Sequence, residues 1–197
     1  MLIPNKKICL NPQSNFINGT EKNIISVEDF WKWAFSDFQA NNIRGVLAEF
    51  IIAKALELEL TVRSTWDDYD LTTPSGIKIE VKSGGFLQSW NQKKLSKIVF
   101  SGLRGQVWDS QNNCRGKSLE YRADIYIFAV QTSDSHNSFN PLDLAQWEFY
   151  VVPKADMIKR SVKSISLETV KKIAMPVIYS KLKTQVSNII QLSARLT

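Results

Sequence analysis

The segment 66–82 constrains the fold most, because two runs of strand-like sequence flank a tight turn. In the second run, Ile77, Ile79 and Val81 alternate with charged residues, so one face of the predicted strand is apolar and the other is charged. Residues 73–76, with the sequence Thr-Pro-Ser-Gly, have the proline and glycine placement of a tight turn. The sequence therefore predicts a β-hairpin over this segment.

Charged side chains gather on this hairpin. Glu80 and Lys82 are two residues apart, so they point to the same face of the strand. Folding at the turn brings Asp70 roughly opposite Glu80, within about one residue of register. The carboxylates, with a backbone carbonyl such as that of Val81, can hold Mg²⁺ or Mn²⁺, and Lys82 can stabilise a transition state by its charge. Such a cluster suits phosphodiester hydrolysis.

A simpler interpretation of the same charges stays open. The Glu-x-Lys pattern is short, and a solvated strand face stabilised by cross-strand ion pairs with Asp68 and Asp70 would also produce it.

The segment 42–60 is apolar on nearly every side, which predicts a helix buried in the core. Between Arg44 and Glu57, the only charged residues are Glu49 and Lys54. A carboxylate among apolar neighbours is costly unless a cation or a hydrogen-bond donor meets it. We therefore expect Glu49 to lie beside the metal site; the alternative is a salt bridge with Lys54 or Arg44.

A helix that carries a glutamate, followed by an aspartate, a turn and Glu-x-Lys in a hairpin, resembles the PD-(D/E)XK nuclease superfamily, the restriction-endonuclease-like fold. Within it, the chain resembles a group of uncharacterised bacterial proteins over roughly residues 40–180. The stretches that carry this narrower resemblance are residues 44–49, 69–71, 79–83, 87–90, 124–128 and 141–150.

The resemblance implies an α/β fold of mixed α+β type, with a central mixed β-sheet flanked by helices. It implies a Mg²⁺-dependent DNA endonuclease, restriction-like or acting in repair, with Asp70 and Glu80 as metal ligands, Lys82 as the catalytic lysine and Glu49 as an additional acidic residue. Because Tyr69 stands where the motif has proline, Asp68 is an alternative to Asp70. A nucleic-acid-binding or assembly protein that keeps the fold without cutting is the alternative function.

Two residues after the hairpin have two interpretations each. Gln88 could position an attacking water or a phosphate, as the resemblance implies, or could be a polar turn residue. Trp90 could stack on a base, but a tryptophan that anchors a loop to the core is the favoured interpretation.

The net charge of +6 and the pI near 9.3 suit a polyanionic partner such as DNA. Basic residues that follow the hairpin could bind phosphates, although a solvated loop would carry the same charges. They are Lys93, Lys94, Lys97, Arg104, Arg115, Lys117 and Arg122.

The 197 residues, of which 44% are hydrophobic, predict one domain with residues 1–25 as an irregular N-terminal arm. Ser26 resembles a helix N-terminus, and the aromatic residues in 30–35 that follow are expected in the core. Further elements are predicted as strands at 97–101, 124–130 and 146–153, a loop over 101–123, and helices from 166 and over 181–192.

Cys9 and Cys114 lack the spacing of a zinc site or a disulfide framework. No signal peptide or membrane span is recognisable, so we expect a soluble, cytoplasmic protein. A homodimer would suit cleavage of both strands of a duplex.

Overall fold

The computed structural model describes the chain in three stretches. They are residues 7–64, 67–109 and 114–194.

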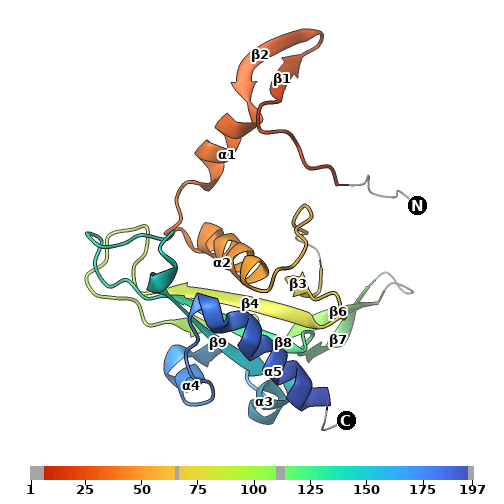
Figure 1. Ribbon diagram of the computed structural model, residues 1–197, viewed down its shortest axis with the longest axis vertical. Coiled ribbons are helices and arrows are strands. Elements are labelled where there is room, and N and C mark those ends of the chain that lie inside the picture. The colour runs from red at the N-terminus through yellow and green to blue at the C-terminus, as the bar shows by residue number, and fades with distance from the viewer. Residues whose placement is uncertain (1–6, 65–66, 110–113, 195–197) are drawn as a thin grey trace.

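A mixed four-stranded sheet lies at the centre, in the order β3-β4-β8-β9 (Figure 1). Its strands are β3 (Leu71–Thr72), β4 (Lys78–Gly85), β8 (Ile125–Gln131) and β9 (Trp147–Pro153). β4 runs parallel to β8 and antiparallel to β3, whereas β8 and β9 are antiparallel. The predicted hairpin is therefore present, although β3 is shorter than the predicted strand.

Helices pack on both faces of the sheet. α2 (Asn41–Ala55) and α5 (Leu182–Ala194) share one hydrophobic core with alternate residues of the strands, and α3 (Lys154–Arg160) and α4 (Leu167–Lys171) share the second core with the others. β8 is buried along its whole length, as expected for a central strand covered on both faces. The structure confirms the predicted mixed sheet flanked by helices.

The buried helix ends earlier than the prediction of 42–60. Glu57 adopts a left-handed backbone conformation with φ of 55°. The N–H of Glu57 donates to the carbonyl of Lys54 at 3.1 Å, and the N–H of Leu58 donates to the carbonyl of Ala53 at 2.9 Å. This is the hydrogen-bond pattern of a Schellman motif, which satisfies the last carbonyls and stops the helix.

The shorter elements lie around the sheet. The predicted strand near 97–101 is β5 (Val99–Phe100), which pairs with β10 (Ile165–Ser166). The prediction of a loop over 101–123 is wrong, because β6 (Gly105–Asp109) and β7 (Cys114–Glu120) form a hairpin there. Its strand-forming residues stand among glycine, serine and asparagine, so the turn-rich composition hid them. The two short 3₁₀ helices are η1 (Leu144–Gln146) and η2 (Tyr179–Lys181).

The remaining predicted elements are present. Strands 124–130 and 146–153 correspond to β8 and β9, and the C-terminal helices correspond to α4 and α5, whereas α3 was not predicted.

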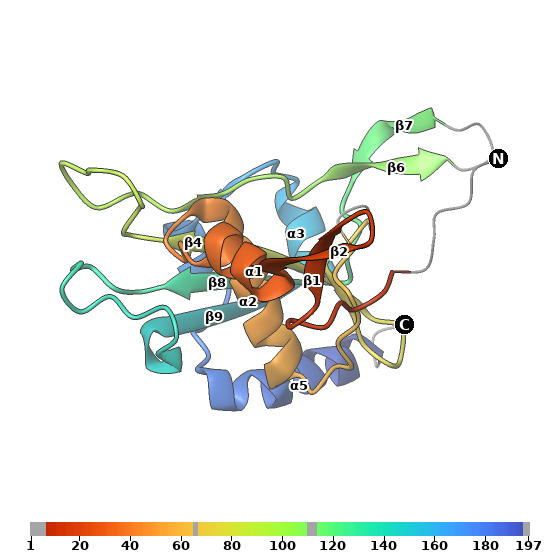
Figure 2. The same ribbon diagram turned by 90° about the horizontal axis from the view of Figure 1, so that it is seen from above.

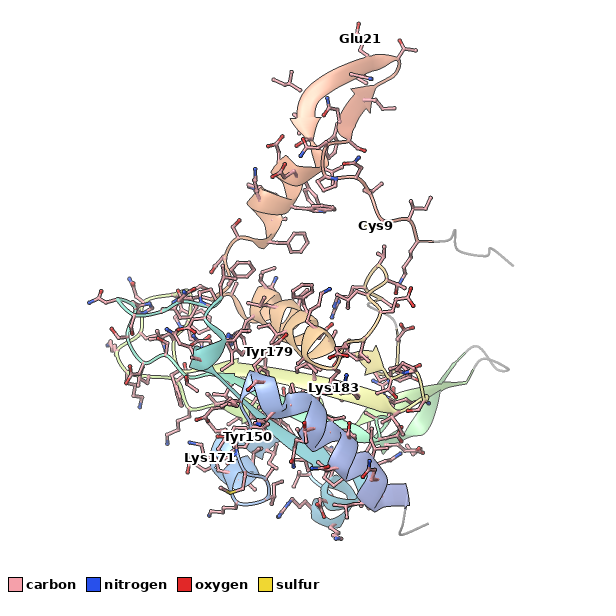
Figure 3. All side chains as sticks on the ribbon, viewed as in Figure 1. Cys9, Glu21, Tyr150, Lys171, Tyr179 and Lys183 are labelled. Atoms are coloured by element: carbon pink, nitrogen blue, oxygen red, sulfur yellow. The ribbon has the colours of Figure 1, made fainter. Side chains whose placement is uncertain are left out.

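A hairpin–helix unit, residues 15–35, extends away from the sheet (Figure 1), and in the view from above it lies in front of α2 (Figure 2). It consists of β1 (Asn15–Asn18), β2 (Glu21–Ser26) and α1 (Val27–Phe35). Glu21 lies near its far tip (Figure 3). The prediction of an irregular arm over residues 1–25 is therefore wrong from residue 15 onward.

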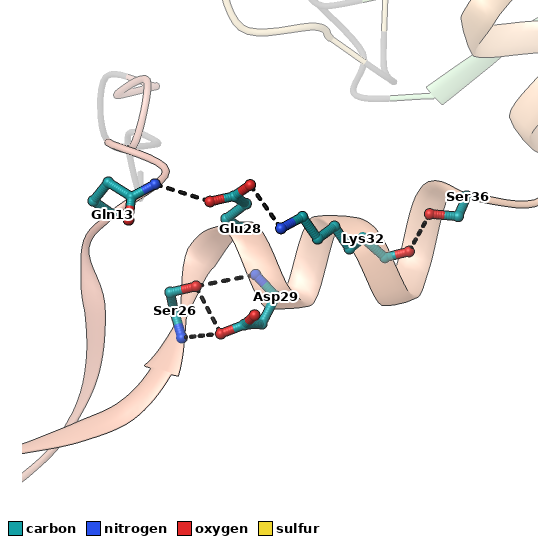
Figure 4. Close-up of polar contacts among 6 residues, drawn as sticks. All are labelled: Gln13, Ser26, Glu28, Asp29, Lys32 and Ser36. Carbon is teal, nitrogen blue, oxygen red and sulfur yellow. Dashed lines mark hydrogen bonds and ion pairs between the residues drawn. The ribbon is translucent and has the colours of Figure 1, made fainter.

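Ser26 begins α1, as predicted. Its hydroxyl accepts from the N–H of Asp29 at 3.1 Å, while its own N–H donates to the Asp29 carboxylate at 2.9 Å, which completes a capping box (Figure 4). The expectation that the following aromatic residues belong to the core is wrong, because Trp33 is 84% exposed and Phe30 and Phe35 are also exposed. The apolar residues of α1 do follow a helical pattern, but the helix lies away from the central sheet and does not bury them against it.

Within the stretches that the structure describes, no helix is long and apolar enough to cross a membrane. Cys9 is an exposed free cysteine, and the side chain of Cys114 lies outside the described part of the chain.

Two glycines give opposite predictions for substitution by alanine. A Cβ at Gly84 would lie 2.5 Å from Cγ2 of Ile98, so we expect Gly84→Ala to lower the free energy of unfolding by about 1–3 kcal/mol. Gly45 lies within α2, where the nearest atom to an added Cβ is Oγ of Ser83 at 3.9 Å, so Gly45→Ala should raise it by about 0.5–1 kcal/mol. Urea unfolding of both variants measures the effects, and equal effects of the same sign would contradict this packing.

Candidate active site at the open edge of the sheet

The hairpin register places Asp70 opposite Glu80, as the sequence predicts. Leu71 pairs with Ile79, and the N–H of Asp70, one residue before β3, donates to the Ile79 carbonyl at 3.1 Å. The N–H of Val81 then donates to Oδ2 of Asp70 at 2.7 Å. The Asp70 side chain therefore takes the place that a further residue of β3 would have occupied.

This edge of β4 is open beyond the short β3. Among the described residues, β3 pairs only with Lys78 and Ile79, whereas β8 pairs along the other side of β4 from Ile79 to Gly85. The N–H and the C=O of one strand residue point to the same side of the strand. Because the Val81 N–H points to Asp70, the Val81 carbonyl also lies on the open edge. The Val81 carbonyl and the Asp70 carboxylate thus lie on the same edge of β4.

Glu80 and Lys82 share the face of β4 that is opposite to Val81. Nζ of Lys82 lies 2.7 Å from Oε1 of Glu80, and both side chains are largely shielded, with 23% and 14% exposed. Gly102 packs behind the amine, because a Cβ built there would lie 3.6 Å from Nζ. Tyr126 lies beside Glu80 on β8, and burial raises its pKa to about 12, with the Glu80 charge adding to the effect. Tyr126 is therefore neutral at physiological pH.

Glu49 reaches the same edge from α2, and Arg63 binds it. The guanidinium donates from Nε and from a terminal nitrogen to the two carboxylate oxygens, both at 2.6 Å. The alternative of a salt bridge with Lys54 or Arg44 is wrong: Lys54 lies over the ring of Phe50 at 5.7 Å, and buried Arg44 donates to backbone carbonyls. No sequence signal identified Arg63, since it lies in the irregular connection between α2 and β3.

The carboxylates influence one another electrostatically. Burial raises the pKa of Glu49, of Asp70 and of Glu80, and the charge of Asp70 raises the pKa of the other two further. The positive charge of Lys82 acts in the opposite direction on all three. The structure thus brings together Glu49, Asp70, Glu80 and Lys82 around one edge of the sheet.

Asp68 takes a different place from Asp70. It forms an ion pair with Arg122, whose guanidinium also donates to the Gln106 carbonyl at 3.4 Å. Asp70 bonds to the edge of β4, so it rather than Asp68 joins Glu80. The positive charge of Arg122 partly offsets the rise in pKa that burial causes at Asp70 and Glu80, so this arginine belongs to the electrostatic surroundings of the site.

Gln88 lies beyond the other end of β4 and takes part in the turn there. Its Nε2 donates to the Gly85 carbonyl at 3.0 Å, its N–H donates to Oε1 of Gln92 at 2.7 Å, and its buried Oε1 has no partner among the described residues. These contacts favour the turn interpretation over a place among the carboxylates. Trp90, nearby, is 56% exposed, so the expectation that it anchors the loop to the core is wrong.

The predicted DNA-binding residues lie in different settings. Lys93, Lys94 and Lys97 are exposed on the connection between β4 and β5. Arg104 donates from Nε and a terminal nitrogen to the Leu119 carbonyl at 3.0 and 2.6 Å, and so links the segment before β6 to β7. Arg115 and Lys117 lie in β7, but their side chains are outside the described part of the structure.

Asp124, which opens β8, fastens the sheet rather than joining the site. Its Oδ2 accepts from the N–H of Lys78 at 2.9 Å. Asp124 therefore links the starts of β4 and β8.

The ligand chemistry fits a hard divalent cation. Over residues 7–64, 67–109 and 114–194, no three histidine, cysteine, aspartate or glutamate side chains are grouped so that they could hold a metal ion. The predicted set needs only two, Asp70 and Glu80, with the Val81 carbonyl. The described hydrogen bonds use Oδ2 of Asp70 and Oε1 of Glu80, which leaves the other oxygen of each carboxylate for a ligand. Mg²⁺ is commonly bound by one or two carboxylates with waters completing the octahedron.

Comparison with known proteins places this arrangement in context. Residues 17–169, more than half of the chain, match the family model described as bacteriophage T4 endonuclease IV. The match includes Glu49, Asp70, Glu80 and Lys82. It begins at residue 17, whereas the resemblance described from the sequence begins at roughly residue 40. No match to the chain was found among curated proteins.

The buried charge of Asp70 gives a pH-dependent prediction. Because burial raises its pKa, the folded protein holds the proton more tightly than the unfolded chain, and the free energy of unfolding falls as pH rises from the ordinary value of 3.8 through the raised value. Asp70→Asn removes the charge and keeps an acceptor for the Val81 N–H. Without divalent metal at pH 7, we expect its Tm to exceed that of the wild type by a few degrees.

Thermal unfolding from pH 4 to pH 8 measures this difference, which should narrow as pH falls toward 3.8. Asp134→Asn, at an exposed aspartate, is the matched control and should leave Tm unchanged. A lower Tm for Asp70→Asn at pH 7 would contradict the inferred cost of this charge.

Proposed function

The chain belongs to the bacteriophage T4 endonuclease IV family, and from this premise we propose that it is a metal-dependent DNA endonuclease whose active site is the carboxylate cluster at the open edge of β4. The observation that carries the proposal is the placement of Asp70 opposite Glu80, with Lys82 paired to Glu80 on the same strand face. Among the described residues, no strand pairs with β4 beyond Ile79 on this side, and we infer that a phosphodiester approaches from there.

The residues that would hold the metal are Asp70, Glu80 and the carbonyl of Val81. Bound Mg²⁺ or Mn²⁺ would supply Lewis-acid polarisation of the phosphoryl oxygens. Its charge would also offset the repulsion that raises the pKa of Glu80 beside Asp70. Each carboxylate keeps one oxygen in a protein hydrogen bond or ion pair, which fixes its orientation before substrate binds.

Lys82 contributes positive charge where negative charge develops during hydrolysis. Glu80 holds its ammonium at 2.7 Å, and Gly102 leaves space for it on the other side. In the reaction, a water oxygen bonds to phosphorus, the bond from phosphorus to the leaving oxygen breaks, and that oxygen gains a proton. An ammonium held in a largely desolvated site stabilises the charge of this transition state more than one in water would.

Glu49 acts as a positioning residue rather than as a direct ligand. Both of its oxygens accept from Arg63, so neither is free to bind a metal without breaking a bidentate ion pair. Burial and the nearby charge of Asp70 nevertheless raise the pKa of Glu49, so the two carboxylates lie close enough to interact. We assign the pair Glu49–Arg63 to fixing the connection that delivers Asp70 to the edge of β4.

The order of the site residues along the chain supports membership of the PD-(D/E)XK superfamily as part of the proposal. A glutamate on α2 precedes an aspartate at the start of β3 and a Glu-x-Lys pattern on β4, and these elements belong to one mixed sheet flanked by helices. For the substrate, the exposed Lys93, Lys94 and Lys97 provide positive charge for phosphates beside the cleaved bond.

Cleavage by charge-neutral variants tests the assignment. We expect Glu80→Gln and Lys82→Met each to lower the rate of DNA cleavage by about 100-fold or more. Glu80→Gln removes the charge of a proposed metal ligand, and Lys82→Met removes the positive charge that stabilises the transition state. The assay compares plasmid, linear, single-stranded and branched DNA with Mg²⁺ or Mn²⁺. Glu168→Gln, at an exposed glutamate of α4, is the matched control and should cut at the wild-type rate.

Binding of the same DNA, measured by fluorescence anisotropy, should persist in Glu80→Gln. Wild-type cutting rates in Glu80→Gln would refute the proposed site. A wild type that binds but cuts no form of DNA with either metal would favour the alternative, a binding or assembly protein on this fold.

Metal binding gives a readout that does not depend on cleavage. Because a ligand of the folded state alone raises its stability, Mg²⁺ or Mn²⁺ at about 100 times its Kd should raise the free energy of unfolding of the wild type by about 2.7 kcal/mol. Asp70→Asn should respond much less, whereas Asp134→Asn should respond like the wild type. Equal metal-induced shifts of Tm in all three proteins would exclude Asp70 as a ligand.

A further inference from the structure

The hairpin–helix unit presents large apolar side chains to solvent. Ile17 on β1, Ile24 on β2 and Trp33 on α1 are 70%, 94% and 84% exposed. Phe30 lies 6.4 Å from Trp33 between ring centroids and 6.2 Å from Phe35, so these three rings form one cluster. Monomeric proteins rarely expose apolar patches of this size unless the patch binds a partner.

The contacts that hold the unit together are local. The capping box of α1 and the ion pair of Glu28 with Lys32 at 2.8 Å act within a few residues, and Gln13 donates to Glu28 at 2.8 Å (Figure 4). Val27 is the one residue of α1 that is buried. An isolated two-stranded hairpin is marginally stable in water, so this unit needs a surface to cover its apolar side chains.

The charge of the unit argues against DNA as that surface. Residues 15–35 contain two lysines against two glutamates and one aspartate, whereas the whole chain has a net charge of +6. A segment with a small negative charge gains nothing from phosphates. An apolar protein surface rich in tryptophan and phenylalanine is the complement that such a unit fits.

The unit exposes enough apolar surface for a dimer that covers it on more than one side. Neighbouring strand residues such as Phe16 and Ile17 point to opposite faces, and over both faces the exposed fractions of the large apolar side chains correspond to roughly 900 Å² at about 200 Å² per side chain. A stable interface covers about 800 Å² of each partner. The same patch on two copies can be self-complementary about a two-fold axis.

We propose that the hairpin–helix unit, residues 15–35, is a dimerisation element that packs against the same unit of a second copy of this chain. This inference is independent of the proposed nuclease activity, because it rests on surface features outside the carboxylate cluster. Residues 17–35 of the unit lie within the range that matches the family model, so most of it belongs to the region shared with the family.

The test is the molar mass of the full chain in solution without DNA or metal, from sedimentation equilibrium over a wide concentration range. We expect a wild-type dimer that dissociates on dilution. The double variant Ile24→Thr, Trp33→Gln keeps strand and helix propensity at exposed positions, and should raise the dimer Kd by about 100-fold or more. The control double variant Leu142→Gln, Met175→Gln removes exposed apolar side chains elsewhere and should dimerise like the wild type.

A second measurement follows the environment of Trp33 directly. The fluorescence of the wild type minus that of Trp33→Phe should shift to shorter wavelength as the protein is concentrated. A wild-type monomer at every concentration, a dimer unaffected by Ile24→Thr, Trp33→Gln, or a dimer that forms only when DNA is added would each overturn the proposal. So would a short-wavelength Trp33 signal at all concentrations with a monomeric mass, since the unit would then cover its own chain.

Discussion

The parallel pairing of β4 with β8 is the constraint on which the rest of the site depends. β8 is buried on both faces, so it fixes one side of β4 and leaves only the opposite side for chemistry. That side is free because β3 is two residues long, and the Asp70 carboxylate takes over the hydrogen bond from the Val81 N–H. A longer β3 would occupy this edge with backbone, and the Val81 carbonyl would no longer be available to a ligand.

The cations that act on the carboxylates at this edge come from segments that are far apart in the chain. Arg63 follows α2, Lys82 belongs to β4, and Arg122 precedes β8, and each acts on at least one of the carboxylates. Burial still raises the pKa of the carboxylates, so the cations do not cancel the cost of desolvation. This residual cost is typical of a site that is stabilised by its ligand rather than by its own packing.

Local patterns predicted the parts of the molecule that depend on neighbours in sequence. The alternation around Glu80 and the turn after β3 predicted the hairpin and its register to within about one residue, and Ser26 predicted the start of α1. The partners Arg63 and Arg122 could not be predicted, because an ion pair between distant segments leaves no periodicity in the sequence. The aromatic residues of α1 were misplaced for a related reason. An apolar helix face predicts a packing surface, but the pattern does not identify the surface, and in this structure the central sheet does not bury these residues.

Gly102 limits how this chain can vary. Its φ of 66° suits glycine, so any other side chain there would strain the backbone, and an added Cβ would make van der Waals contact with the amine of Lys82 at 3.6 Å. The β4–β8 pairing does not involve this position. A substitution there would therefore strain the backbone beside the proposed catalytic lysine while leaving the pairing of the sheet intact, so the surroundings of the lysine can vary in this family independently of the fold.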